Sequence, residues 1–140
     1  MRVLLDTCVI IDTLQDRCPF SDDGKQIFLY AATNIFNGYI TAKSVTDIYY
    51  LVHKSTHDNA ATKNILNKLF SLFDILDTAG IDCKKALLSA TADYEDAVMI
   101  ESAFHNEIDC IVTRNERDYG NSPVKVYTPK QFIQVLSENL

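Results

Sequence analysis

The chain has 140 residues, of which 47% are apolar and 23% charged, and it contains no low-complexity tract or internal repeat. These values exclude a disordered chain and predict a single domain over residues 1–140, large enough to bury roughly two-thirds of its unfolded surface. The net charge of -6 argues against a simple nucleic-acid-binding module, because phosphate contacts need Lys and Arg. An acidic chain can still act on nucleic acid if its carboxylates gather around a cation.

The amino-terminal residues lead directly into an apolar stretch without the features of a signal peptide, and no later run has the length of a membrane span. We therefore expect a cytoplasmic protein that does not contact a membrane. The cysteines form no C-x-x-C pair, so most of them are expected to be reduced core residues. They are Cys8, Cys18, Cys83 and Cys110.

Strands and helices alternate along the first half of the chain. Val3–Leu5 is a short apolar run typical of a buried parallel strand, and TCVIIDTLQ after it can form a short helix. Helical spacing returns in KQIFLYAATNIF, which Asn37 and Gly38 are expected to end before a second strand at GYIT. A helix from Ser44 over SVTDIYYLVHK, a helix over ATKNILNKLFSLF and a third strand near DILDT follow.

The same alternation continues to the carboxyl terminus. Helices are predicted over CKKALLSA and YEDAVMIESAFHN, and strands over CIVT and VKVYT. In the tail PKQFIQVLSENL, Pro129 suits the first helical position and Thr128 suits the cap. The pattern predicts an α/β fold, a three-layer α/β/α sandwich around a central, mostly parallel sheet of four to five strands.

Four aspartates stand where carboxylates can carry chemistry. Asp6 follows the first strand and Asp118 follows CIVT, and the carboxyl ends of parallel strands meet at one edge of the sheet. Asp96 lies on the face of its helix that also carries Met99, which should pack inward. Asp47 lies beside the apolar stripe of the helix SVTDIYYLV.

Helix capping is the alternative role for three of these acids. Ser44 with Asp47, and Asp93 with Asp96, have the spacing of a capping box, and Asp6 is equally placed for an N-cap. Acids in the first turn of a helix also suit the helix dipole. Asp118, taken alone, could be a solvated loop residue.

The combination of four acids favours a cation site. Two unit charges 4 Å apart repel by about 4 kcal/mol at an effective dielectric near 20, and a divalent cation removes that repulsion. Carboxylate oxygens suit Mg²⁺ or Mn²⁺, and Mg²⁺ is often held by one or two carboxylates together with a substrate phosphate. The expected chemistry is phosphodiester cleavage in which a metal activates water and stabilises the leaving oxygen.

Three blocks of the sequence resemble the PIN domain family, as found in VapC-type ribonuclease toxins. They are LLDTCVIID at the start, SVTDIYYLVHK in the middle and YEDAVMIESAFHNEIDCIVTRNERDYGNSPVKVYTP near the end. The last block is the most specific, because its helical EDA, strand IVT, turn RN and trailing DY occur together at this spacing in the family. The resemblance covers essentially the whole chain.

Position by position, the resemblance implies three metal-binding acids, Asp6, Asp96 and Asp118, with Asp47 as a fourth acid that positions metal-bound water or acts as an outer ligand. Two residues depart from the family pattern. Many relatives have glutamate where this chain has Asp47, and many have asparagine where it has Cys8. The shorter carboxylate and the altered neighbour of Asp6 weaken support for the site without removing the acids.

The resemblance also implies accessory residues around the acids. Thr113 and Asn115 would orient a ligand, a water or a neighbouring carboxylate. Four basic side chains flank the acids in sequence and could hold phosphates, although exposed Lys and Arg are usually solvated. They are Lys43, Lys54, Arg114 and Arg117.

The function implied is that of a Mg²⁺- or Mn²⁺-dependent endoribonuclease, the toxin of a type II toxin–antitoxin pair. The implied partners are an RNA substrate, a small antitoxin protein and a second copy of the chain. A PIN-fold protein that has lost efficient cleavage and acts by binding a partner is the main rival interpretation.

Other α/β functions fit less well. An aspartyl-phosphate phosphatase needs a second aspartate where Cys8 stands, and a signalling receiver needs adjacent acids after the first strand. A nucleotide-binding fold is disfavoured because none of the four glycines forms a phosphate-binding loop.

Overall fold

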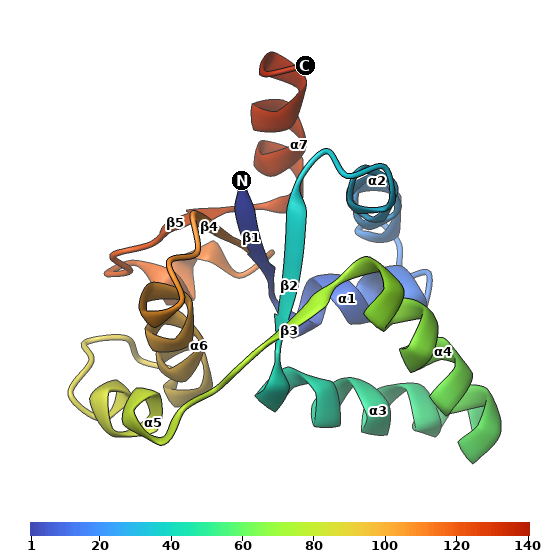
Figure 1. The fold of residues 1–140 in the computed structure, drawn as a ribbon, viewed down its shortest axis with the longest axis horizontal. Helices are drawn as coiled ribbons and strands as arrows, with labels where there is room; N and C mark the ends of the chain where they lie inside the picture. Colours follow the sequence, from blue (N-terminus) through green and yellow to red (C-terminus); the bar gives the residue numbers. More distant parts are fainter.

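All 140 residues are described by the computed structural model, which contains five strands, seven α-helices and one 3-10 helix (Figure 1). In chain order the elements are β1 (Arg2–Leu5), α1 (Thr7–Leu14), α2 (Ser21–Ala32), β2 (Asn37–Thr41), α3 (Ala42–Thr56), α4 (Asn59–Leu72), β3 (Asp74–Leu76), α5 (Gly80–Ala86), α6 (Tyr94–His105), β4 (Cys110–Val112), η1 (Glu116–Tyr119), β5 (Lys125–Tyr127) and α7 (Pro129–Glu138).

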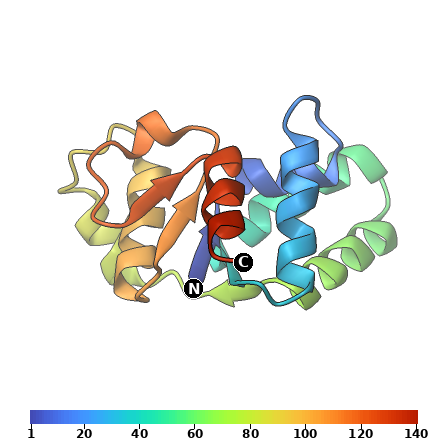
Figure 2. The same cartoon turned by 90° about the horizontal axis from the view of Figure 1, so that it is seen from above.

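The five strands form one sheet in the order β3-β2-β1-β4-β5, and every neighbouring pair is parallel. Helices α5 and α6 lie on one side of this sheet, and α1 to α4 lie on the other (Figures 1 and 2). The predicted three-layer α/β/α architecture is confirmed, and all the strands are parallel.

Alternation of side chains along β1 explains why both faces of the sheet are covered. Val3 and Leu5 belong to the larger buried cluster, which is completed by residues of α1, α2, α3, α4 and α7. Leu4 points into the smaller cluster, which includes Met99 of α6. A central parallel strand must be apolar on both faces, and β1 is fully buried from Val3 to Leu5.

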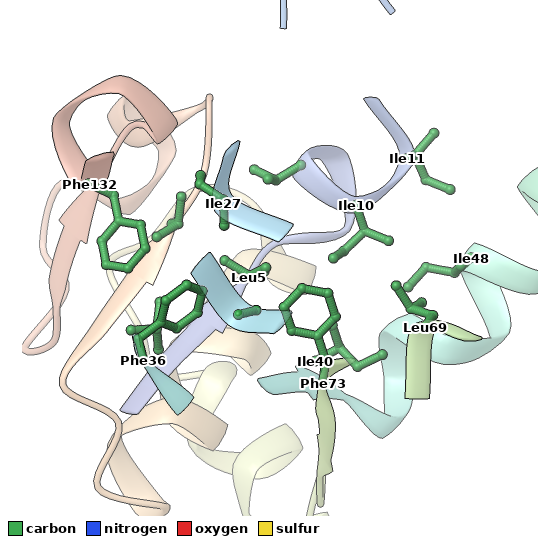
Figure 3. Close-up of a cluster of buried hydrophobic side chains, with 14 of the residues drawn as sticks. Leu5, Ile10, Ile11, Ile27, Phe36, Ile40, Ile48, Leu69, Phe73 and Phe132 are labelled. Carbon is green, nitrogen blue, oxygen red and sulfur yellow. The ribbon is translucent and has the colours of Figure 1, made fainter. Parts of the chain in front are cut away.

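The larger cluster ties the outer helices to the sheet. Phe36, which precedes β2, packs edge-to-face on Phe132 of α7, with ring centroids 5.1 Å apart. Leu5 and Ile40 from the sheet and Ile10 from α1 fill the neighbouring space (Figure 3). This packing holds the carboxyl end of β1, and the start of α1 after it, in a fixed position.

Three local expectations are wrong. Helix α2 ends at Ala32, and Asn37 begins β2 instead of ending the helix. Helix α3 begins at Ala42 with Thr41 as its cap, because the Thr41 hydroxyl accepts a hydrogen bond from the Ser44 N–H. The expectation for the cysteines is wrong only in part: all four are free, but only Cys110 is fully buried, while Cys8 and Cys83 are half-buried against buried clusters and Cys18 is exposed.

The predicted cap of the last helix is confirmed. Thr128 accepts from the Gln131 N–H at 3.2 Å, and the Gln131 side chain accepts from the Thr128 N–H at 2.9 Å. Pro129 occupies the first helical position. None of the helices in the structure is both long enough and apolar enough to span a membrane.

Candidate functional site

The candidate site lies where β1 and β4 end side by side. In the sheet, β2 lies on one side of β1 and β4 on the other, and the chain continues from β1 toward the side of β2. A crevice is therefore expected between the carboxyl ends of β1 and β4. The Asp6 N–H donates to the Val112 carbonyl at 2.9 Å, which fixes the two strand ends relative to each other. Asp6 and Thr113, the residues that follow the two strands, therefore meet.

Asp6 is buried, with 8% of its surface exposed, and its carboxylate does not cap α1. Its Oδ2 instead accepts hydrogen bonds from the Thr113 hydroxyl at 2.7 Å and the Tyr119 hydroxyl at 3.3 Å. The Cys8 thiol lies 3.5 Å from the same oxygen. Side-chain capping is thus excluded for Asp6 in this structure.

Cys8 occupies the space beside Asp6 as a neutral thiol. Burial, followed by the negative charge of Asp6, raises the pKa of the Cys8 thiol to about 11. The sulfur also lies 3.7 Å from the Thr113 hydroxyl. Without a bound metal, Cys8 is therefore a neutral thiol that can act as a weak donor to Asp6.

Asp96 faces Asp6 from the first turn of α6. The cap of this helix is Asp93, whose carboxylate accepts from the Asp96 N–H at 3.1 Å, while the Asp96 carboxylate accepts from the Tyr119 hydroxyl at 3.1 Å. Burial, then the negative charges of Asp6 and Asp93, raise the pKa of Asp96 to about 6. Two carboxylates are thus held near each other without a cationic side chain hydrogen-bonded to either.

Tyr119 joins the two acids and was not among the predicted site residues. Its side chain is 2% exposed, and its hydroxyl contacts Asp6, Asp96 and the Met99 sulfur. Burial and the two neighbouring acids raise its pKa, so it remains a neutral phenol. The signal that could have revealed it is its position directly after Asp118, in the DY pair of the most specific sequence block.

Asp118 lies on the exposed side of η1, next to Tyr119. Its charge makes a small contribution to raising the pKa of Asp96, but its carboxylate forms no hydrogen bond or ion pair. In the structure no three His, Cys, Asp or Glu side chains come together as a ready metal cage. Of the three acids predicted to bind metal, the structure therefore brings Asp6 and Asp96 together through Tyr119, and Asp118 lies near them without a hydrogen bond to either.

Asp47 is the sixth residue of α3, beyond the first turn in which we expected it. The Lys43 ammonium pairs with Asp47 at 2.7 Å and with Glu95 of α6 at 3.0 Å. A cleft of about 620 Å³ has Asp6, Asp47 and Glu95 among its lining residues. Glu95 is thus a further acid of the site, and its position directly before Asp96 could have identified it.

A chain of hydroxyl groups fixes the start of α3 beside Asp6. The Thr7 hydroxyl donates to the Ser44 hydroxyl at 2.9 Å, and the Thr41 and Ser44 hydroxyls lie 2.8 Å apart. Thr41 and Ser44 are buried. These neutral contacts position the helix that carries Asp47 without adding a charge to the cleft.

Thr113 and Asn115, the first and last residues of the T-R-N turn, behave differently. The Thr113 hydroxyl accepts from the Asn115 N–H at 3.1 Å while it donates to Asp6, as expected of a residue that orients a carboxylate. The Asn115 side chain is exposed and forms no hydrogen bond. Arg114 lies against the Phe20 ring and its Nε is 2.8 Å from Asp12, so it is engaged away from the acids.

The paired acids fit a hard divalent cation. Mg²⁺ is usually held by one or two carboxylates and keeps several waters, so the pair Asp6 and Asp96 provides the number of protein ligands it needs. Burial first, and then repulsion by Asp6 and Asp93, raise the pKa of Asp96, and a bound cation would relieve the repulsion. Both members of the pair offer carboxylate oxygens, the ligands that suit Mg²⁺ or Mn²⁺.

A family model described as PIN domain matches residues 2–117, which confirms the resemblance seen in the sequence. No curated protein matches the chain. Solved structures, however, share its fold at low identity.

A toxin–antitoxin complex from Klebsiella pneumoniae has a TM-score of 0.67 at 20% identity, covering 91% of this chain and 97% of that chain. VapBC2 from Rickettsia felis, bound to a DNA fragment from its promoter, has a TM-score of 0.68 at 16% identity, with coverage of 91% and 98%. The sarcin–ricin loop cleaving toxin VapC20 from Mycobacterium tuberculosis has a TM-score of 0.60 at 11% identity, with coverage of 78% and 86%.

Proposed function

Because the chain belongs to the PIN domain family, we propose that it is a divalent-metal-dependent endoribonuclease and the toxin of a type II toxin–antitoxin pair. One observation carries the proposal: Asp6 and Asp96 share the buried Tyr119 hydroxyl at the carboxyl ends of β1 and β4, and no cationic side chain neutralises them. Asp6 is buried and Asp96 is half-buried, and two carboxylates so placed without a cationic partner favour a counter-ion, which a divalent cation supplies.

In this proposal Asp6 and Asp96 hold Mg²⁺ or Mn²⁺. When bound, such an ion activates water for attack on a phosphodiester and stabilises the leaving oxygen. Thr113 orients Asp6, and Asp118 adds negative charge beside Asp96. Asp47 faces the same cleft and takes an outer role, since Lys43 already binds its carboxylate.

The substrate path is the least specified part of the proposal. Lys43 links Asp47 with Glu95, so two of its three ammonium donors are already engaged by carboxylates and its charge is offset by them. Arg114 pairs with Asp12, which speaks against direct contact with RNA at the acids. Lys54 lines the cleft beside Asp6 and has no ion-pair partner, so it is the better candidate for a phosphate contact.

The test is cleavage of labelled structured RNAs by purified protein in Mg²⁺, in Mn²⁺ and in EDTA. We expect metal-dependent cleavage that is lost in Asp6→Asn and Asp96→Asn. Asp77→Asn is a matched control, because Asp77 is exposed and forms no hydrogen bond or ion pair. Equal cutting by the wild type and both site variants would identify a contaminating nuclease and contradict the assignment.

The partner proposal draws on the solved structures that share the fold, several of which are toxin–antitoxin complexes. We propose that this chain binds a small antitoxin protein and forms a homodimer. Co-purification with the product of a neighbouring small gene, and the mass of the free protein measured by light scattering, test the two statements separately.

A specific observation favours the rival function, in which the fold acts by binding a partner without efficient cleavage. The Lys43 ammonium pairs with Asp47 and Glu95, two acids that line the cleft, and Asp118 stands apart from the pair of Asp6 and Asp96. A stable complex with an antitoxin, combined with no cleavage and no cation binding by the isolated chain, would support this alternative.

A further inference from the structure

Tyr119 reaches the two acids because two elements fix its ring. It is the last residue of η1, and its ring packs in the smaller buried cluster with Met99 and Ile111. The hydroxyl therefore emerges from an apolar environment directly between Asp6, at 3.3 Å, and Asp96, at 3.1 Å. A ring held in this way cannot follow the carboxylates, so the carboxylates must adjust to the ring.

The hydrogen bonds are distributed unequally over the four carboxylate oxygens. Thr113, Tyr119 and Cys8 all contact Asp6 at Oδ2, and Tyr119 contacts Asp96 at Oδ1. Neither Asp6 Oδ1 nor Asp96 Oδ2 forms a hydrogen bond or ion pair with the protein. One oxygen of each acid is anchored, and the other is left available.

Anchoring one oxygen fixes the direction of the other, because the terminal torsion of an aspartate is otherwise broad. We propose that Tyr119 is a positioning residue: its hydroxyl holds one oxygen of Asp6 and one of Asp96, so that the free oxygen of each carboxylate can bind the same divalent cation. This inference rests on the proposed function, since it concerns the cation of that site.

The two acids depend on Tyr119 to different degrees. Asp6 retains Thr113 at 2.7 Å and the Cys8 thiol if the phenol oxygen is removed. The Asp96 carboxylate has no other hydrogen-bond donor in the structure. A phenol also has one proton, so it can donate fully to only one carboxylate at a time. Loss of the hydroxyl should act mainly by freeing Asp96.

The test is Tyr119→Phe, which retains the buried ring and removes only the oxygen. Affinity for Mn²⁺ is measured by calorimetry without RNA, well below the unfolding temperature. We expect Mn²⁺ to bind about tenfold more weakly or worse, as is typical when a residue that orients a metal ligand is lost. The matched control is Tyr39→Phe, which loses a 2.7 Å contact with Arg2 away from the acids and should leave Mn²⁺ affinity unchanged.

A second measurement separates positioning from general destabilisation. If the wild type cleaves RNA, the Mn²⁺ concentration for half-maximal rate should rise in Tyr119→Phe, and saturating Mn²⁺ should restore most of the rate. A variant that binds Mn²⁺ as tightly as the wild type would overturn the inference while leaving the proposed function intact. Wild-type protein that binds neither Mn²⁺ nor Mg²⁺ would overturn both.

Discussion

Two buried aspartates near opposite ends of α1 have opposite surroundings. Asp12 is 2% exposed and faces cations, with Arg114 Nε at 2.8 Å from one oxygen and an Arg17 nitrogen at 3.7 Å from the other. Asp6 is 8% exposed and receives only neutral donors, while a second acid, Asp96, lies across the Tyr119 hydroxyl. Both acids are taken out of water, but only one is given a counter-charge by the chain.

The difference separates a structural acid from a functional one. A buried charge is stable only if it is paired, so Asp12 with Arg114 can serve as a fixed connection between α1 and the turn after β4. Asp6 and Asp96 repel each other in the free protein, so they are prepared for a cation from outside. Thr113 contacts Asp6 and its neighbour Arg114 pairs with Asp12, so the same turn holds the functional acid and the structural one.

The largest expected effect concerns the functional acid. Asp96→Asn should lower metal-dependent RNA cleavage by about 1,000-fold, because a ligand for the cation is lost. The free energy of unfolding in EDTA should stay the same or rise, because repulsion with Asp6 disappears. Urea unfolding and initial cleavage rates measure the two effects. A parallel loss of activity and stability would indicate that Asp96 is structural, like Asp12.

The structural acid should show the reverse pattern. Arg114→Met should reduce the free energy of unfolding by roughly 3 kcal/mol, because the buried Asp12 carboxylate would keep only the more distant Arg17. Arg117→Met is the matched control, because Arg117 is exposed in the same turn and forms no ion pair. Urea denaturation provides the comparison, and equal stability of the two variants would contradict the assignment.

The pH dependence of stability should also identify the unpaired acid. Folding raises the pKa of Asp96 from 3.8 to about 6, so the folded state binds more protons than the unfolded state between these values. In EDTA the stabilisation by the protonated Asp96 carboxyl is complete below pH 3.8 and is lost as the pH rises through about 6. Allowing for solvent screening of a half-exposed group, it amounts to about 1 kcal/mol.

The measurement is urea unfolding between pH 4 and pH 7, with Asp96→Asn as the comparison. In Asp96→Asn, the free energy of unfolding should lack the part of its pH dependence that the Asp96 carboxyl contributes in the wild type. An identical pH dependence in both proteins would mean that folding does not raise the pKa of Asp96.

The smallest effect is expected for Lys43, which pairs with two acids of the cleft. Lys43→Met should lower stability by less than about 1 kcal/mol, because both of its ion pairs are partly exposed and screened by salt. It should also strengthen Mn²⁺ binding slightly by removing a nearby positive charge. Lys63→Met is the control, because Lys63 is exposed and unpaired. A large loss of stability would show that this lysine behaves like Arg114.

The sequence by itself determined the architecture and one part of the site. Strand and helix periodicity predicted the α/β sandwich, and Thr128 before Pro129 predicted the last cap, because both signals depend on near neighbours in the chain. The strand ends placed Asp6 at the same sheet edge as the turn after β4, and the resemblance to the PIN family implied that Thr113 orients a neighbouring carboxylate, as it does for Asp6.

Tertiary structure alone decided what surrounds each acid. Tyr119 meets Asp6 across 113 positions, and Arg114 turns toward Asp12 instead of the cleft. No local pattern distinguishes an aspartate beside a phenol from one beside a guanidinium, because the partner arrives from a distant segment through the packing of η1 and α1. The sequence supplied the carboxylates, and the fold determined which of them is left without a counter-charge.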